Sequence, residues 1–336
     1  MDVLSRLFSR RSVGLPQPLV DSLTRPGHPA TRHPPQGRAR PCPRGVHAPA
    51  GLRPAGSEPE LSQGAVHRRY FARGEGPQRV LFIHGFQASA RIWHAVQHEL
   101  PTDRYTTIAI NNRGAGGSDA PASEHAYGVP TFAIDAFELV QQLGWRDFTL
   151  VGHSLGGATV AQFAVDHPEL LQGLVLLDPS DPDGRDASPE EIDRIVDERM
   201  AARRAQRARG RRGGDGIDAG QAGGSEEWLQ LLTADIEAAP EARLRGSMRS
   251  MYALRLGDQV RALSMPVLLA GGDGDALIPL GAMLSTWAKY PEGTGLHMWH
   301  GIGHSPNVEC PGELAAVLRH FIEVTIPARR NGAAAD

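Results

Sequence analysis

A serine flanked by glycines carries the strongest chemical signal in the sequence. The segment Gly152-His153-Ser154-Leu155-Gly156 follows an apolar stretch, Phe148 to Val151, and precedes a helical stretch that begins at Ala158. A serine on a sharp strand-to-helix turn must adopt a crowded backbone conformation, so small flanking residues prevent clashes and lift its hydroxyl above the sheet edge. The helix start also points backbone N–H groups toward the serine. The motif predicts a nucleophilic serine beside a site that stabilises a developing oxyanion.

Apolar segments of strand length alternate with helical segments along most of the chain from Val66 onward. The predicted strands are Val66 to Ala72, Val80 to Ile83, Tyr105 to Ile110, Phe148 to Val151, Leu174 to Leu177, Val267 to Ala270 and Leu296 to Trp299. The predicted helices are Ile92 to Leu100, Thr131 to Leu143, Ala158 to His167, Leu280 to Tyr290 and Gly312 to Val324. This β-α-β alternation predicts an α/β fold whose mostly parallel sheet is covered on both faces.

The alternation breaks once, between residues 179 and 263, where no strand is apparent. Three helices are predicted there, at Glu190 to Arg207, Glu227 to Ala238 and Ala242 to Leu256. We therefore expect a helical cap, or lid, at 179–263, inserted into a core formed by 61–178 and 264–328. The basic run Arg203 to Arg212 inside this insertion is interpreted either as a solvated helix end with a linker or as a patch for an anionic ligand.

Both ends of the chain are predicted to be disordered. Residues 1–60 are rich in proline and arginine and lack sustained apolar periodicity, so they bury too little to offset their ordering entropy. An arginine-rich targeting peptide and an over-long gene start remain alternatives for this segment. A short disordered tail is expected at 329–336.

Composition excludes several classes of function. The formal net charge of −3 gives no field that would attract nucleic acid or a membrane, and the longest apolar runs are far too short for a membrane span. The two cysteines, Cys42 and Cys310, can build neither a disulfide framework nor a metal cluster, so a reducing, cytoplasmic location is expected. No flavin, nicotinamide or metal motif is present, so we expect no cofactor. The sequence leaves the oligomeric state open.

The serine motif and four further stretches resemble the landmarks of the α/β-hydrolase superfamily in order and spacing. The four stretches are His84-Gly85-Phe86, Asn112 to Asp119, Gly272 to Asp275 with Pro279 after it, and Gly303 to Pro306 followed by Glu309 and Pro311. Together they span about Val66 to Pro327. The resemblance implies an α/β-hydrolase fold with a helical cap and the activity of an esterase-like serine hydrolase.

The resemblance also implies a Ser-His-Asp triad. Ser154 corresponds to the nucleophile, His304 to the general base, and Asp275, just past a predicted strand, to the acid that orients the histidine. The chain order of serine, aspartate and histidine is the order that this fold uses. Asp178, which ends the preceding strand, and Asp273 remain alternatives for the acid.

The remaining site residues follow from the same resemblance. The backbone amides of Phe86 and Leu155 are expected to form the oxyanion hole. His84 and His153 occupy positions that the fold fills for structural reasons, so they are not expected to be catalytic. The three histidines within 296–304 lack the spacing and the carboxylate support of a metal site.

A serine nucleophile implies a covalent acyl-enzyme that water then hydrolyses, which disfavours relatives with a carboxylate nucleophile. We expect a small acyl or aromatic ester as the substrate. Lactones, amides and thioesters use the same machinery, and a C–C bond hydrolase, a cofactor-free perhydrolase and a non-catalytic binding protein remain alternatives. The candidate substrate-binding residues are Phe86, Gln87, Trp228, Leu231, Met248, Met251 and Tyr252.

Overall fold

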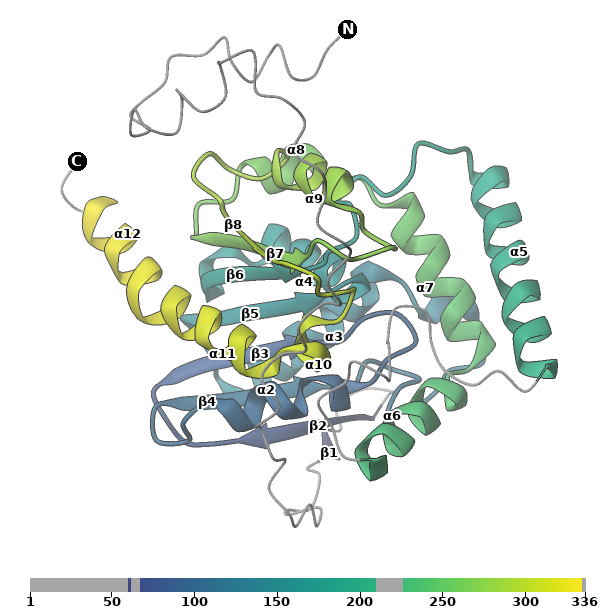
Figure 1. Ribbon diagram of the computed structural model, residues 1–336, viewed down its shortest axis with the longest axis horizontal. Helices are drawn as coiled ribbons and strands as arrows, with labels where there is room; N and C mark the ends of the chain where they lie inside the picture. The colour runs from purple at the N-terminus through teal and green to yellow at the C-terminus, as the bar shows by residue number, and fades with distance from the viewer. Residues whose placement is uncertain (1–59, 62–66, 210–225, 334–336) are drawn as a thin grey trace, which may run out of the picture. The chain divides into compact units, whose positions relative to one another are not determined.

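Eight strands form one sheet within the residues that the structure describes, which are 60–61, 67–209 and 226–333 of this computed structural model (Figure 1). The strands are β1 (Glu60–Leu61), β2 (Arg68–Arg73), β3 (Gln78–Ile83), β4 (Tyr105–Ile110), β5 (Phe148–His153), β6 (Leu171–Leu177), β7 (Val267–Gly272) and β8 (Gly295–Trp299). Their order is β1-β2-β4-β3-β5-β6-β7-β8. The β1–β2 and β2–β4 pairs are antiparallel, whereas every pair from β4 to β8 along this order is parallel. The predicted mostly parallel sheet is confirmed.

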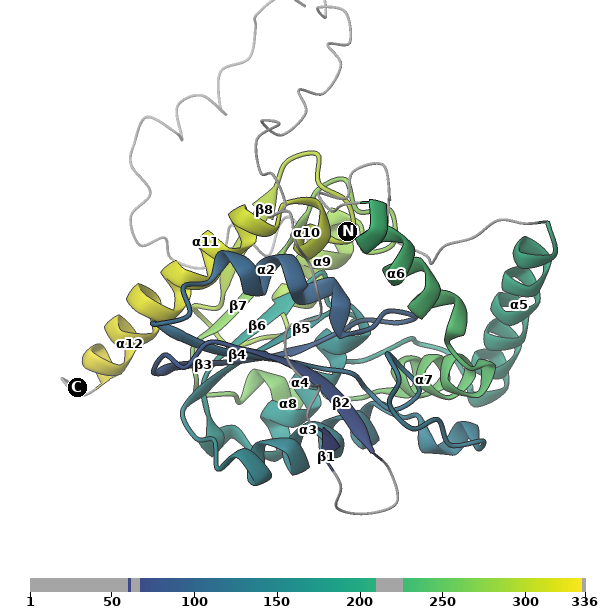
Figure 2. The same ribbon diagram turned by 90° about the horizontal axis from the view of Figure 1, so that it is seen from below.

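Helices cover both faces of this sheet, with α3, α4 and α8 on one face and α2 and α11 on the other (Figures 1 and 2). Apart from α5, α6 and α7, the described helices are η2 (Ala90–Trp93), α2 (His94–Glu99), η3 (Glu124–Ala126), α3 (Val129–Leu143), α4 (Leu155–Asp166), η4 (Pro168–Leu170), α8 (Gly257–Arg261), α9 (Leu280–Trp287), α10 (Pro306–Glu309), α11 (Pro311–His320), η5 (Phe321–Thr325) and α12 (Ile326–Ala333). This arrangement agrees with the predicted layers.

Alternate side chains of the central strands pack on opposite faces of the sheet. In β3, Leu81 and Ile83 join the core beneath α3 and α4, whereas Val80 and Phe82 join the core beneath α2 and α11. All four side chains are fully buried. Because both faces are covered, these strands are continuous apolar runs rather than alternating ones, which is the pattern that made them visible in the sequence.

Among the described residues, three long helices and then the short α8 lie between β6 and β7, where the sequence predicted an all-helical insertion. The long helices are α5 (Pro189–Ala208), α6 (Glu226–Ala238) and α7 (Glu241–Ala253). α5 begins at a capping box in which Ser188 and Glu191 satisfy each other's backbone amides. α5 and α7 lie side by side in both views (Figures 1 and 2) and share an apolar cluster that includes Val196, Met200 and Leu244. Residues 210–225 lie outside the described residues, as do 1–59 of the segment that was predicted to be disordered.

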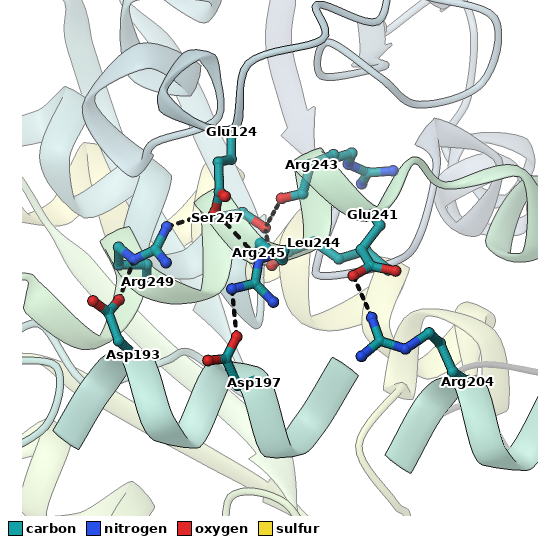
Figure 3. Close-up of polar contacts among 10 residues, drawn as sticks. All are labelled: Glu124, Asp193, Asp197, Arg204, Glu241, Arg243, Leu244, Arg245, Ser247 and Arg249. Carbon is teal, nitrogen blue, oxygen red and sulfur yellow. Dashed lines mark hydrogen bonds and ion pairs between the residues drawn. The ribbon is translucent and has the colours of Figure 1, made fainter. Parts of the chain in front are cut away.

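Arginines of α7 connect α5 to the core (Figure 3). Arg249 bonds Glu124 of η3 at 2.6 Å and Asp193 of α5 at 2.5 Å. Arg245 bonds Asp197 of α5 at 2.5 Å and lies 3.5 Å from Glu124. Exposed ion pairs contribute little free energy one by one. Their shared geometry nevertheless fixes how α5 and α7 lie on η3.

The C-terminal helix differs from the prediction. α12 continues through 329–333, where the sequence predicted a disordered tail, and 334–336 lie outside the described residues. Ile326 is buried against Gly173 of β6, and Arg329 donates to the carbonyl of Gly293. These contacts with distant residues hold a segment whose own composition gives no reason for order. Of the described helices, none combines the length and the apolar character needed to cross a membrane.

A buried ionic cluster joins β2 to α3. Asp135 accepts hydrogen bonds from Arg68, which is almost completely buried, and from Arg113 at 2.5 and 2.8 Å. Arg68 also contacts Glu138, whose side chain is 45% exposed. A buried charge that loses its partner destabilises a fold strongly, because it can neither move to water nor find another counter-ion.

We predict that Asp135→Asn lowers the free energy of unfolding by about 3–5 kcal/mol, because Arg68 then stays buried without its main carboxylate. The matched control Glu138→Gln removes the exposed partner of the same arginine and should cost less than about 1 kcal/mol. Urea denaturation of both variants measures the difference. Equal, small losses for the two variants would show that the cluster does not stabilise the β2–α3 contact.

Candidate active site

Ser154 lies at the sharp junction between β5 and α4. Its φ of 54° and ψ of −117° are a strained combination for a residue with a side chain. A Cβ on Gly152 would lie 2.2 Å from the Gly156 carbonyl oxygen, and one on Gly156 would lie 2.4 Å from the Ile83 carbonyl oxygen. Only glycine fits these two positions. The Ser154 amide donates to the Leu177 carbonyl at 2.9 Å, so the turn is tied to the end of β6.

His304 and Asp275 form a buried hydrogen-bonded pair. Nδ1 of His304 lies 2.6 Å from Oδ2 of Asp275, and the two residues are 8% and 4% exposed. The other oxygen of Asp275 accepts the backbone amides of Leu277 at 2.6 Å and Ile278 at 3.0 Å. Burial acts to raise the pKa of Asp275, but the hydrogen bond and charge of His304, together with these amides, lower it below its usual value. An ionised Asp275 keeps the proton on Nδ1, so Nε2 is the ring atom that can accept one.

Hydrogen bonds on two sides hold the His304 loop beside the serine turn. Nε2–H of His153 donates to the His304 carbonyl oxygen at 2.7 Å. Glu309 accepts the backbone amides of Gly303 at 2.7 Å and Ser305 at 2.9 Å. Because His153 directly precedes the serine, these contacts bring the two loops to the same end of the sheet.

Asp178, one alternative for the acid, lies beside Asp275. The ligand atoms of Asp178, Asp275 and His304 all lie within 4.8 Å of one another. Oδ1 of Asp178 accepts the Gly272 amide at 3.2 Å, whereas its buried Oδ2 has no donor facing it. Burial, followed by the negative charge of Asp275, raises the pKa of Asp178 well above its usual value. Of the two neighbouring carboxyl groups, Asp178 is therefore the one whose surroundings favour the protonated form.

Asp273, the other alternative, belongs to a surface turn. Its carboxylate accepts the Gly301 amide at 2.6 Å and contacts Nδ1 of His300 at 2.8 Å. These two contacts, in that order, lower the pKa of Asp273. Both of its oxygens are thus used away from His304.

The Asp178, Asp275 and His304 group is also the one cluster of potential metal ligands found among the described residues. Its two best-placed ligand atoms, Nδ1 of His304 and Oδ2 of Asp275, already bond each other at 2.6 Å. A cation would have to break that hydrogen bond to bind. The geometry favours proton transfer over metal coordination at this position.

The loop after β3 lies against the serine. A Cβ on Gly85 would lie 3.1 Å from Cβ of Ser154. His84 anchors this loop, because its Nδ1–H donates to the Gly85 carbonyl at 2.9 Å and its Nε2 accepts the Asn112 amide at 3.1 Å. Burial, followed by the charge of Arg243, lowers the pKa of His84 to about 3, so the ring is neutral. A neutral ring with both nitrogens bonded has a structural role.

The backbone amides of Phe86 and Leu155 belong to residues that adjoin the contact between Gly85 and Ser154. Leu155 is the first residue of α4, where backbone N–H groups have no intrahelical acceptor. Phe86 directly follows Gly85 in the anchored loop. Within the described residues, neither amide donates to a protein group. Both amides can therefore donate to an oxygen of a ligand.

The predicted substrate-binding residues do not all lie together. Phe86, Gln87 and Met248 line one cavity of about 60 Å³. Met251 lies near the Ser154 turn, since its Sδ accepts a hydrogen bond from Ser180, whose amide donates to the Ser154 carbonyl at 3.1 Å.

The other three predicted pocket residues are not among the residues that line this cavity, although Tyr252 packs against the same apolar cluster as Phe86. Trp228 belongs to the apolar cluster beneath α2 and α11, Tyr252 packs under the guanidinium of Arg185, and Leu231 is exposed. Residues of α5 line the cavity instead, and the sequence argument missed three of them: Arg199, Met200 and Ala202. The signal was present as helical spacing, because Arg199 lies four residues before Arg203, where the recognised basic run begins.

A larger cavity of about 510 Å³ lies at the far edge of the sheet, between β8 and α11. Leu268, Leu296 and Phe321 are among its lining residues. None of the predicted site residues lines it, so size alone does not identify the reactive centre of this fold.

The comparison with known families and proteins agrees with this geometry. A family model described as the alpha/beta hydrolase fold matches residues 78–210. Protein Rv2715 of Mycobacterium tuberculosis is 29% identical over 298 residues, covering 82% of this chain and 85% of the relative. A non-heme haloperoxidase of Rhodococcus erythropolis is 26% identical over 261 residues, covering 73% of this chain and 92% of the relative.

Solved structures show the same fold. An esterase from Thermogutta terrifontis superposes with a TM-score of 0.66 at 23% identity, covering 80% of this chain and 98% of the esterase. The sheet order, the loops that meet at Ser154 and these similarities support one assignment. The chain has the alpha/beta hydrolase fold, and its segment 78–210 matches the model of that family.

Proposed function

We propose that the protein is a serine hydrolase that cleaves a carboxylic ester, or a related acyl bond, of a small substrate. The observation that carries this proposal is the buried His304–Asp275 pair, held at 2.6 Å in a loop that is hydrogen-bonded to the residue preceding Ser154. A buried histidine with an ionised acid on one nitrogen is suited to act as a base through the other nitrogen.

In the proposed reaction, Nε2 of His304 takes the proton of the Ser154 hydroxyl while Oγ attacks the substrate carbonyl carbon. The resulting oxyanion accepts hydrogen bonds from the amides of Phe86 and Leu155. When the C–O bond to the alcohol breaks, His304 returns the proton to the leaving oxygen. Water, deprotonated by His304, then attacks the acyl-serine, and the acid leaves as the serine recovers its proton.

We also propose that 179–263 acts as a cap over this site. Phe86 packs against the apolar cluster shared by α5 and α7, so the insertion contacts the loop that carries one oxyanion amide. Substrate contacts by Phe86, Gln87, Met248 and Met251 are part of the same proposal. Trp228 and Tyr252 do not line the cavity, so substrate contacts by these two residues have less support.

A second candidate is cofactor-free perhydrolysis, in which hydrogen peroxide replaces water in attacking the acyl-serine. The similarity to a non-heme haloperoxidase over 92% of that protein favours it as an additional activity. Incubation with acetic acid and hydrogen peroxide would yield peracetic acid and water through acetyl-Ser154. The bromination of monochlorodimedone reports the rate of peracid formation. We expect this rate to stay far below the rate of ester turnover and to fall to zero in Ser154→Ala.

We predict that Ser154→Ala abolishes both labelling by a fluorophosphonate and turnover of p-nitrophenyl esters, with a fall in kcat/KM of about 10⁴-fold or more. His304→Ala should fall by a similar factor, because the groups act as a unit. Intact-mass spectrometry counts the adduct, and an unchanged unfolding midpoint controls for structure. A folded wild-type protein that takes up no probe would overturn the serine-hydrolase proposal.

Amide substitution should lower kcat strongly at Asp275 and hardly change it at Asp178. Asp275→Asn reverses the hydrogen bond that fixes the His304 tautomer and should lower kcat by about 10⁴-fold. Asp178→Asn replaces a neutral carboxyl with a neutral amide, and asparagine tolerates the left-handed backbone at this position, where φ is 40°. We therefore expect kcat within about threefold of wild type. Steady-state kinetics with one ester measures kcat for both variants. A large loss in Asp178→Asn with little loss in Asp275→Asn would assign the acid to Asp178.

A further inference from the structure

A small cavity lies between the loop that follows Gly85 and the helices α5 and α7. Its volume is about 60 Å³, and its lining residues are Phe86, Gln87, Arg199, Met200, Ala202, Arg203, Gln206 and Met248. Among the described residues, two guanidinium groups and two carboxamides line this space and no carboxylate does. The lining therefore offers hydrogen-bond donors and positive charge over an apolar floor of two methionines.

The carboxamide of Gln87 points to a missing ligand. Gln87 is 5% exposed and has a left-handed backbone with φ of 59°. Its side chain makes no hydrogen bond to any described residue. Neither polar atom of the Gln87 side chain is among the fully buried unpaired atoms, so the carboxamide stays accessible from the cavity. A strained glutamine persists only where the surrounding structure holds it. A ligand that accepts a hydrogen bond from Gln87 would satisfy the amide.

Arg199 supplies the charge. The other arginines along the exposed faces of α5 and α7 bond acids or carbonyls, as Arg194 does with Glu198 at 2.9 Å and Arg204 with Glu241 at 2.6 Å. Arg199 makes no ion pair or hydrogen bond with the described residues. It lies one helical turn before Arg203, which donates to the Ile236 carbonyl at 2.9 Å, so both side chains lie on the cavity side of α5.

We propose that this cavity binds a carboxylate carried by the substrate, so that the enzyme prefers short anionic esters, such as hemiesters of dicarboxylic acids, over neutral esters of equal length. This inference rests on the proposed function, because it extends the acyl site at Ser154. Planar guanidinium and carboxamide donors match a carboxylate, and the small volume excludes bulky groups. Gln87 directly follows Phe86, whose amide is proposed for the oxyanion hole, so the anion belongs close to the scissile carbonyl, as in hemiesters of short dicarboxylic acids.

The test compares matched esters in wild type, Arg199→Gln and the control Arg194→Gln. The anionic substrates are p-nitrophenyl hemisuccinate and hemiglutarate, and the neutral ones are p-nitrophenyl butyrate and valerate. In wild type, kcat/KM should favour the anionic member at low salt. Arg199→Gln should lower the anionic-to-neutral ratio about 10- to 100-fold, which is the usual range for a hydrogen bond to a charged group. Arg194→Gln, on the same helix but outside the cavity, should leave the ratio unchanged.

Two further measurements separate the outcomes. Arg199→Glu should reverse the preference, and added NaCl should reduce the preference in wild type and in Arg194→Gln alike. Fluorophosphonate labelling of every variant reports on the serine itself. If labelling and neutral-ester turnover are intact but the ratio does not change in Arg199→Gln or Arg199→Glu, the carboxylate site is wrong and the serine hydrolase stands. If no ester is turned over and no probe is taken up, the proposed function has failed first.

Discussion

The site depends on one crowded turn, in which the backbone of Ser154 is held at a positive φ between the end of a buried strand and the start of a helix. A non-glycine residue reaches that conformation only if its surroundings compensate the strain. Here two contacts compensate the strain. Gly156 approaches β3 closely, and the backbone amide of Ser154 donates a hydrogen bond to the end of β6. The same approach brings the loop after β3 against the serine, so the strain that exposes the hydroxyl also places the nearby Phe86 amide.

Around this turn burial shifts the pKa values of three titratable groups toward their neutral forms. Burial, before any other cause, lowers the pKa of His84 and of His153 to about 3 and raises the pKa of Asp178. Asp275 differs from Asp178, because the hydrogen bond and charge of His304 and two backbone amides outweigh burial and lower its pKa. A charge in a poorly solvated environment acts strongly on the histidine that it contacts. The opposite pKa shifts of Asp275 and Asp178 are the electrostatic basis for proposing different roles for these two neighbouring aspartates.

The insertion uses arginine in two ways. Arg245 and Arg249 bond acids of α5 and η3 and so fix the position of the helices, whereas Arg199 faces a cavity with no acid among its described lining residues. Paired arginines orient the insertion, and an unpaired one keeps its donors for a ligand. The proposed preference for anionic substrates follows from this difference and not from the overall charge of the protein, which is close to neutral.

The sequence by itself determined the sheet, because strands that are buried on both faces must be continuous apolar runs, and it placed the serine motif between a strand and a helix. The resemblance named Asp275 as the acid, but Asp178 and Asp273 also follow the ends of strands, and only the contact of Asp275 with the His304 loop, 29 residues away, separates the three. The sequence argument missed the order of 329–333 and the place of Arg199 at the cavity. Local pattern reports which face of a segment is apolar. Tertiary packing decides which other segment that face meets. Arg199 and Gln87 are 112 residues apart in the chain, and they line one cavity only because α5 folds back over the loop after β3.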